Sequence, residues 1–176
     1  LGWLDYDPGA PVLQLGVGKG EATAVLAGAC PEAPWLACDD DLPSLRAARV
    51  ALTRAGVSNV LLVRCDLARP PLRAGGFPAI LHFGVLHTVL DAADHVRRLA
   101  PLLPVGGRLA GVTLAESTLP HLAAQQAALG AKAGVRWVPM ERLAKRLMGR
   151  GWSSFRHEQP SNWMARFVAI RSPIDS

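Results

Sequence analysis

Cysteine is scarce in this sequence, and the cysteines that are present form no recognisable pattern. Three occur among 176 residues, Cys30, Cys38 and Cys65, without a Cys-x-x-Cys pair. An odd number at this spacing indicates neither a disulfide framework nor a zinc site. We therefore predict no metal site and expect a reducing, cytoplasmic environment.

Long hydrophobic runs and a secretion signal are also lacking. The most apolar run, residues 78–90, is interrupted by His82 and His87, whereas a membrane-spanning helix needs about 20 apolar residues. The chain begins at Leu1 without the basic, apolar and small-residue order of a signal peptide. No membrane span and no secretion are expected.

Apolar residues are abundant overall. They make up 50% of the chain, charged residues make up 19%, and the mean hydropathy is +0.20. This composition excludes an intrinsically disordered protein. A chain of 176 residues has the size of one ordinary domain, and we expect one domain over residues 1–176.

Positive charge is concentrated near the C-terminus. The net charge is +5, and residues 131–176 carry nine basic but only three acidic side chains. Such a region can meet nucleic acid, anionic lipid or an acidic substrate, or it can simply form a solvated surface. The solvated surface is the preferred interpretation, so nucleic acid is not expected as a partner.

Five short apolar runs predict buried parallel strands. Each has four or five residues, most have Gly, Pro or Asp near one end, and none alternates with polar residues, as suits strands covered on both faces. The strands are predicted at residues 12–15, 35–38, 60–63, 79–83 and 109–113.

Helices are predicted between these strands. Their approximate ranges are 20–29, 42–55, 91–102, 118–129 and 139–149. Asp41 is the expected N-cap of the second helix. Residues 152–158 and 163–170 predict an antiparallel hairpin. The alternation predicts an α/β fold: a Rossmann-like, doubly wound, mostly parallel seven-stranded sheet with helices on both faces.

Ligands bind outside the carboxyl ends of the strands in such sheets. The loop Gly16–Gly20 follows the first strand, and its glycines allow close approach of a ligand to backbone N–H groups. Asp39 ends the second strand, where a carboxylate can accept hydrogen bonds from ribose hydroxyls. It is expected at the surface without a structural role, because Asp41 caps the helix. Asp66 and Leu67 follow the third strand and suit an amino-substituted ring.

The order and spacing of these segments resemble the class I S-adenosylmethionine-dependent methyltransferases. The closest branch contains small-molecule enzymes similar to the ubiquinone and menaquinone biosynthesis methyltransferases. Residues 12–20 look like the first motif of the family, 37–39 like its ribose-binding strand end and 65–67 like its adenine-binding turn. Residues 83–87 and 102–109 resemble the segments that flank the fourth and fifth strands.

This resemblance implies an S-adenosylmethionine cofactor and in-line methyl transfer to a small-molecule acceptor. Nine positions would contact the cofactor: Gln14, Gly16, Val17, Gly18, Asp39, Asp40, Asp66, Leu67 and His82. His82 would border the sulfonium end, and His82 and His87 are the candidates for a catalytic base. Residues 115–138 would form much of the acceptor pocket.

The sequence departs from the family at two places. Gln14 stands where the family usually has an acid, so attraction to the ammonium group of the cofactor is lost. About ten residues precede the first strand, whereas relatives commonly carry a helical cap there. The site would then be open, covered by a partner, or completed by residues outside this sequence, and a homodimer stays among these alternatives.

Two other functions stay open. A dinucleotide-dependent oxidoreductase would share the fold, but its Gly-x-Gly-x-x-Gly fingerprint needs glycine where Glu21 stands. A non-catalytic cofactor-binding or partner-binding domain of the same fold would suit Gln14 and the short N-terminal region. The spacing of the glycines favours the methyltransferase.

Overall fold

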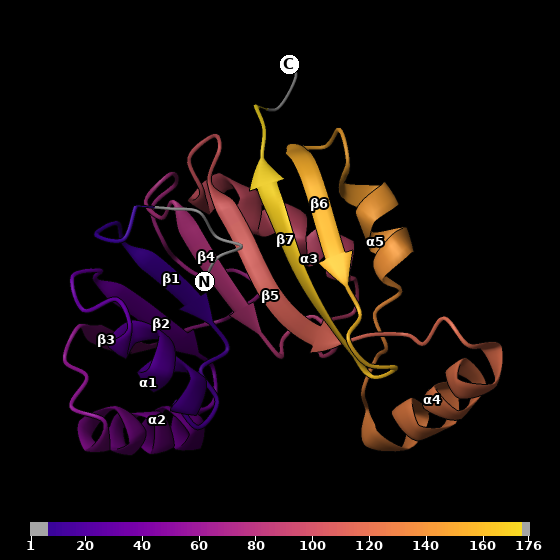
Figure 1. The fold of residues 1–176 in the computed structure, drawn as a ribbon, viewed down its shortest axis with the longest axis horizontal. Helices are drawn as coiled ribbons and strands as arrows, with labels where there is room; N and C mark the ends of the chain where they lie inside the picture. The colour runs from indigo at the N-terminus through magenta and orange to yellow at the C-terminus, as the bar shows by residue number, and fades with distance from the viewer. Residues whose placement is uncertain (1–6, 174–176) are drawn as a thin grey trace.

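A seven-stranded sheet forms the centre of the protein, whose computed structural model describes residues 7–173. The strands are β1 (Val12–Leu15), β2 (Trp35–Asp39), β3 (Val60–Arg64), β4 (Ala79–Phe83), β5 (Arg108–Leu114), β6 (Trp152–Glu158) and β7 (Met164–Arg171). Their order is β3-β2-β1-β4-β5-β7-β6 (Figure 1). The strands β1 to β5 pair in parallel, and β7 is antiparallel to both neighbours. The predicted fold, including its C-terminal hairpin, is confirmed.

Helices cover both faces of this sheet. They are α1 (Glu21–Gly28), α2 (Leu42–Arg54), α3 (Ala92–Leu99), α4 (Pro120–Ala133) and α5 (Met140–Leu147), and a short 3-10 turn, η1 (Ala100–Leu102), follows α3. The helix α3 lies behind the sheet in Figure 1, and α4 lies beyond the lower end of β5.

One helix end was predicted wrongly. The sequence predicts that the fourth helix ends before Gly130, but α4 continues to Ala133 and stops at Gly134, whose φ of 65° provides a left-handed C-cap. Gly130 is retained inside the helix because a Cβ there would lie 2.6 Å from the carbonyl oxygen of Val135. A packing contact, not a helix stop, accounts for this glycine.

Side chains along each central strand alternate between two buried layers. In β1, Leu13 and Leu15 pack with the layer of α3 and α5, whereas Val12 packs with Leu81 in the layer of α1. Both faces of these strands are therefore apolar. This double burial explains the continuous apolar runs in the sequence.

The start of α2 agrees with the sequence prediction. The backbone of Asp41 is extended, and its carboxylate accepts a hydrogen bond from the N–H of Ser44 at 2.8 Å. The prediction that Asp41 caps this helix is confirmed.

The strands β1 and β4 lie side by side. The strands that follow β1 in the chain, β2 and β3, lie on one side of this pair, and the strands that follow β4 lie on the other, so the strand order reverses here. A crevice opens at the carboxyl ends of strands at such a switch point. The loops at residues 16–20 and 84–91 follow these two strands. They therefore meet at the place where a ligand is expected.

Within residues 7–173, no helix combines the length and the apolar character needed to cross a bilayer. The longest, α4, has 14 residues, and a spanning helix needs about 20. All three cysteines are unpaired thiols.

Candidate functional site

An open pocket of about 500 Å³ lies at the carboxyl ends of β1, β2 and β3. Six of the nine cofactor positions predicted from the sequence line it: Gly16, Gly18, Asp39, Asp40, Asp66 and Leu67. The segment after β4 forms the opposite wall, through Phe83, Gly84, Val85, Thr88 and Val89. Residues from four separate strand ends are thus brought together.

The glycines of the first loop have different structural reasons. Gly16 has φ of 82°, and a Cβ there would lie 2.3 Å from the carbonyl oxygen of Phe83. Gly20 allows close approach of α1 to α2, since a Cβ would lie 2.5 Å from the Cα of Ala48. A Cβ on Gly18 would meet no atom within 4 Å. Gly18 therefore leaves room on the pocket side, where a ligand can approach the backbone.

Asp39 is a buried structural acid, and the expectation of a surface position was wrong. Its side chain is only 7% exposed. Oδ2 accepts hydrogen bonds from the N–H groups of Val17 and Gly18, both at 2.9 Å, and Oδ1 accepts one from the N–H of Asp41 at 3.0 Å. The carboxylate therefore holds the glycine loop against the end of β2.

Asp40 and Asp66 present exposed carboxylates to the pocket. One oxygen of Asp66 accepts a hydrogen bond from the N–H of Ala68 at 2.8 Å, whereas the carboxylate of Asp40 makes no hydrogen bond or ion pair with any residue from 7 to 173. No group of three or more acidic, His or Cys side chains in this range is placed to hold a metal. Asp40 is thus the acid in the pocket whose carboxylate is fully available.

Gln14 and Val17 do not reach the pocket wall. Gln14 is completely buried; its Nε2 donates to the carbonyl oxygen of Gly16 at 3.2 Å, and its Oε1 has no hydrogen-bond partner among residues 7–173. Val17 is buried, and its N–H is taken by Asp39. Both residues contact the loop or its carboxylate partner, and neither lines the pocket.

His82 does not face the pocket either, although the sequence analysis placed it at the methyl donor. It is 0% exposed, and its Nε2 lies 2.8 Å from the Nε2 of His95 on α3. Burial and the neighbouring His95 hold the pKa of His82 well below its usual value, and burial lowers the pKa of His95 to about 4. The two imidazoles form a neutral pair inside the core, which does not suit a catalytic base.

His87 has a different setting. It lines a second, apolar groove of about 440 Å³ together with Phe83, Val112, Leu114 and Met164. The groove shares Phe83 and Gly84 with the first pocket. Burial lowers the pKa of His87, and its buried Nδ1 has no hydrogen-bond partner in the described part of the chain. His87 thus places a neutral imidazole beside the junction of the two hollows.

The walls of this groove lie outside residues 115–138, which the sequence predicts as much of the acceptor pocket. The walls come instead from the ends of β4 and β5 and from the start of β7, where Leu114 pairs with Met164. The rule of reading residues at strand ends would have found Leu114. Met164 can be assigned to the groove only when the register between β5 and β7 is known.

Family and sequence comparisons give a consistent result. A family model described as a methyltransferase domain matches residues 12–107. An uncharacterized methyltransferase of Mycobacterium tuberculosis is 33% identical over 108 residues, covering 61% of this chain and 52% of that protein. The tRNA (guanine-N(7)-)-methyltransferase of Albidiferax ferrireducens is 36% identical over 62 residues, covering 35% and 25%. The chain matches a quarter to half of the length of these relatives.

Solved structures share the fold at low identity. The YcgJ protein from Bacillus subtilis has a TM-score of 0.81 and 15% identity, covering 98% of this chain and 96% of that chain. Phosphoethanolamine N-methyltransferase 2 of Haemonchus contortus, in complex with phosphomonomethylethanolamine and S-adenosylhomocysteine, has a TM-score of 0.79 and 12% identity, covering 94% and 49%. These similarities establish the arrangement of strands and helices.

The position of Asp39 generates a prediction about stability. Replacing Asp39 with Ala should lower the free energy of unfolding by at least about 2 kcal/mol, because three backbone N–H groups lose a charged acceptor. The matched control Asp40→Ala should change it by less than about 0.5 kcal/mol. Urea unfolding of both variants measures the difference. Equal stability of the two variants would show that the loop does not depend on Asp39.

The buried histidine pair predicts a loss of stability in acid. The pKa of His95 is lowered on folding to about 4, so the unfolded chain binds protons first. Stability present at pH 7 is then lost as the pH falls through 6.5 towards 4. Between pH 7 and pH 5, His95 alone should lower the free energy of unfolding by about 2 kcal/mol, and His82 should add to this fall.

Urea unfolding of two variants at both pH values tests this assignment. His95→Gln should show a clearly smaller pH dependence, whereas the exposed control His121→Gln should keep that of the parent. If His95→Gln retains the full dependence, the acid sensitivity arises elsewhere.

Proposed function

The chain belongs to the class I S-adenosylmethionine-dependent methyltransferases, and we propose that it transfers a methyl group from S-adenosylmethionine to a small-molecule acceptor. One observation carries this proposal: strand-end residues that are far apart in the sequence line a single pocket at the switch point of the sheet. Family membership supports the methyltransferase over a dinucleotide-dependent oxidoreductase.

The residues of the pocket fit this cofactor. A volume of about 500 Å³ is in the usual range for pockets of small ligands. The unpaired carboxylate of Asp40 suits the ribose hydroxyls, and Asp66 with Leu67 suits the adenine ring. The open side of Gly18 leaves room for the methionine part. Asp39, which the sequence analysis assigned to the ribose, is proposed instead to hold the loop that these groups surround.

Gln14 is proposed to act through the loop and not through contact with the cofactor. Its Nε2 donates to the carbonyl oxygen of Gly16, which fixes the turn directly after β1. The side chain is completely buried, so an acid at this position would carry an uncompensated buried charge in the empty protein. The amide keeps the hydrogen bond without that cost.

The apolar groove is the proposed site of the acceptor. Its walls are almost entirely aliphatic or aromatic, and it opens beside Phe83 and Gly84, which also line the cofactor pocket. This lining favours a small molecule with an apolar body. The groove is a hollow of about 440 Å³, which suits a compact compound.

His87 is the proposed catalytic residue of this chain. S-adenosylmethionine supplies an activated methyl group when bound, so the protein must orient the acceptor and, where needed, remove its proton. The low pKa of His87, caused by burial, keeps its imidazole neutral at pH 7 and able to accept a proton. His87 lines the apolar groove, where the acceptor would lie.

Titration calorimetry with S-adenosylhomocysteine tests cofactor binding directly. The parent chain should bind one equivalent, and Asp40→Ala should weaken binding at least about tenfold because the ribose loses a charged acceptor. Asp41→Ala removes a neighbouring carboxylate of equal charge and should bind like the parent. Absence of binding to folded protein, or equal affinity of all three proteins, contradicts the assigned cofactor pocket.

A methyl-transfer assay with a panel of small apolar acceptors tests the role of His87. For an acceptor that must lose a proton, His87→Gln should reduce turnover by about a hundredfold or more, with unchanged affinity for S-adenosylhomocysteine. His121→Gln, an exposed histidine outside the groove, should leave turnover unchanged.

The alternative, a non-catalytic cofactor-binding domain of the same fold, is favoured by the loss of the usual acid at Gln14. It predicts that S-adenosylhomocysteine binds while no acceptor is methylated. Turnover of any acceptor in the panel by the purified chain excludes this alternative.

A further inference from the structure

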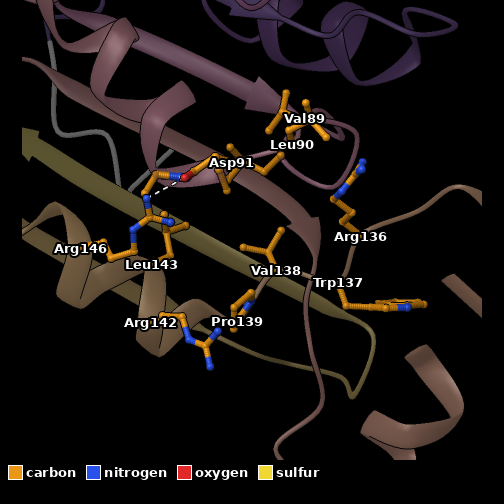
Figure 2. Close-up of a pocket in the computed structure, with 13 residues that line it drawn as sticks. Val89, Leu90, Asp91, Arg136, Trp137, Val138, Pro139, Arg142, Leu143 and Arg146 are labelled. Carbon is orange, nitrogen blue, oxygen red and sulfur yellow. Dashed lines mark hydrogen bonds and ion pairs between the residues drawn. The ribbon is translucent and has the colours of Figure 1, made fainter. Parts of the chain in front are cut away.

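A third pocket, of about 200 Å³, carries an unusual concentration of positive charge. It lies between the segment after β4 and the helix α5 (Figure 2). Three arginines line it, Arg136, Arg142 and Arg146, and Asp91 is the one acid among its lining residues. The pocket therefore has an excess of two positive charges.

Asp91 cannot neutralise this excess. Its Oδ2 accepts a hydrogen bond from Arg146 at 2.7 Å, and its Oδ1 accepts two from the first backbone N–H groups of α3. The bond from Arg146 lowers the pKa of Asp91 to about 2, so its carboxylate stays charged and committed. The side chains of Arg136 and Arg142 make no hydrogen bond or ion pair with the described part of the chain.

The position of Arg142 is not explained by the stability of α5. It lies in the first turn of the helix, where the helix dipole disfavours a positive charge, whereas Lys145 and Arg146 lie in the last turn, where it favours one. A positive charge at the N-terminal end of a helix is unfavourable unless a nearby negative charge offsets it. A bound anion would do so.

The surroundings of these arginines are fixed by contacts between distant segments. The backbone N–H of Arg136 donates to the carbonyl oxygen of His87 at 2.9 Å, which ties the linker before α5 to the loop after β4. The pair of Arg146 with Asp91 ties α5 to the start of α3. The segments that carry the arginines are therefore held together by contacts within the protein, without a ligand.

The base of the pocket is apolar. Leu86, Val138 and Leu143 are buried residues that line it. Val89 lines both this pocket and the cofactor pocket, so the two hollows adjoin across the loop after β4. A ligand held here would have an anionic group on the arginines and an apolar part on this base.

We propose that the pocket lined by Arg136, Arg142 and Arg146, whose guanidinium groups lie on different sides of it (Figure 2), binds the phosphate or carboxylate group of a small organic ligand. Guanidinium groups recognise both oxyanions through paired, charge-assisted hydrogen bonds. The wall at Val89 is shared with the cofactor pocket, where the methyl group would be donated, so a methyl acceptor that extends beyond the apolar groove is one source of this group. This assignment rests on the proposed function, and a separate effector is the other source. A small hollow with an apolar base suits one anionic group better than a continuous nucleic-acid backbone.

Calorimetric titration with phenyl phosphate at constant ionic strength tests the site. The pocket variant Arg136→Gln/Arg142→Gln is compared with Lys132→Gln/Arg150→Gln, which removes the same charge from exposed positions outside the pocket. The parent and the control should bind saturably, and the pocket variant at least tenfold more weakly. Equal affinity of the two variants, or no saturable binding by the parent, overturns the proposal.

Further binding measurements show whether the methyl acceptor or a separate ligand supplies the anionic group. If S-adenosylhomocysteine tightens phenyl phosphate binding, the acceptor supplies the group; if the two bind independently, a separate ligand does, and either result retains the anion site. Absence of S-adenosylhomocysteine binding would remove only the proposed function. The proposal also fails if a hairpin RNA binds with steep salt dependence and is weakened equally by both variants, because the arginines then belong to a nucleic-acid surface.

Discussion

The hydrogen bonds from the glycine loop to the carboxylate of Asp39 set the geometry of the candidate cofactor pocket. They join the turn after β1 to the end of β2 through a buried charged acceptor. With the loop held in this way, Gly18 faces open space and Asp40, one residue further along the chain, is left exposed. The neighbouring aspartates therefore differ in environment: Asp39 is buried and bound to the loop, whereas Asp40 is exposed in the pocket.

Residues at the end of β4 and in the loop after it lie in three different environments. His82, still within the strand, turns into the core and pairs with His95. Phe83 and Gly84 border both the cofactor pocket and the apolar groove. A few residues further, Val89 borders the pocket of arginines. A segment of eight residues therefore connects the core, the proposed reaction site and the proposed anion site.

The sequence predicts the strands and the start of α2 correctly because those features depend on local patterns: continuous apolar runs and an Asp cap. It fails where a contact joins distant residues. Asp39 looked like a surface acid because its partners lie 21 and 22 residues away. His82 looked like a base because its partner His95 lies on another element. The end of α4 was missed because Gly130 is required by packing against Val135.

A crystal structure of the chain with S-adenosylhomocysteine tests the division of roles between Asp39 and Asp40 most directly. The account predicts that the ribose hydroxyls lie within hydrogen-bonding distance of the Asp40 carboxylate, while Asp39 keeps its bonds to the N–H groups of Val17 and Gly18. A ribose bound to Asp39 with those loop bonds broken, or a ligand bound away from the glycine loop, would contradict it.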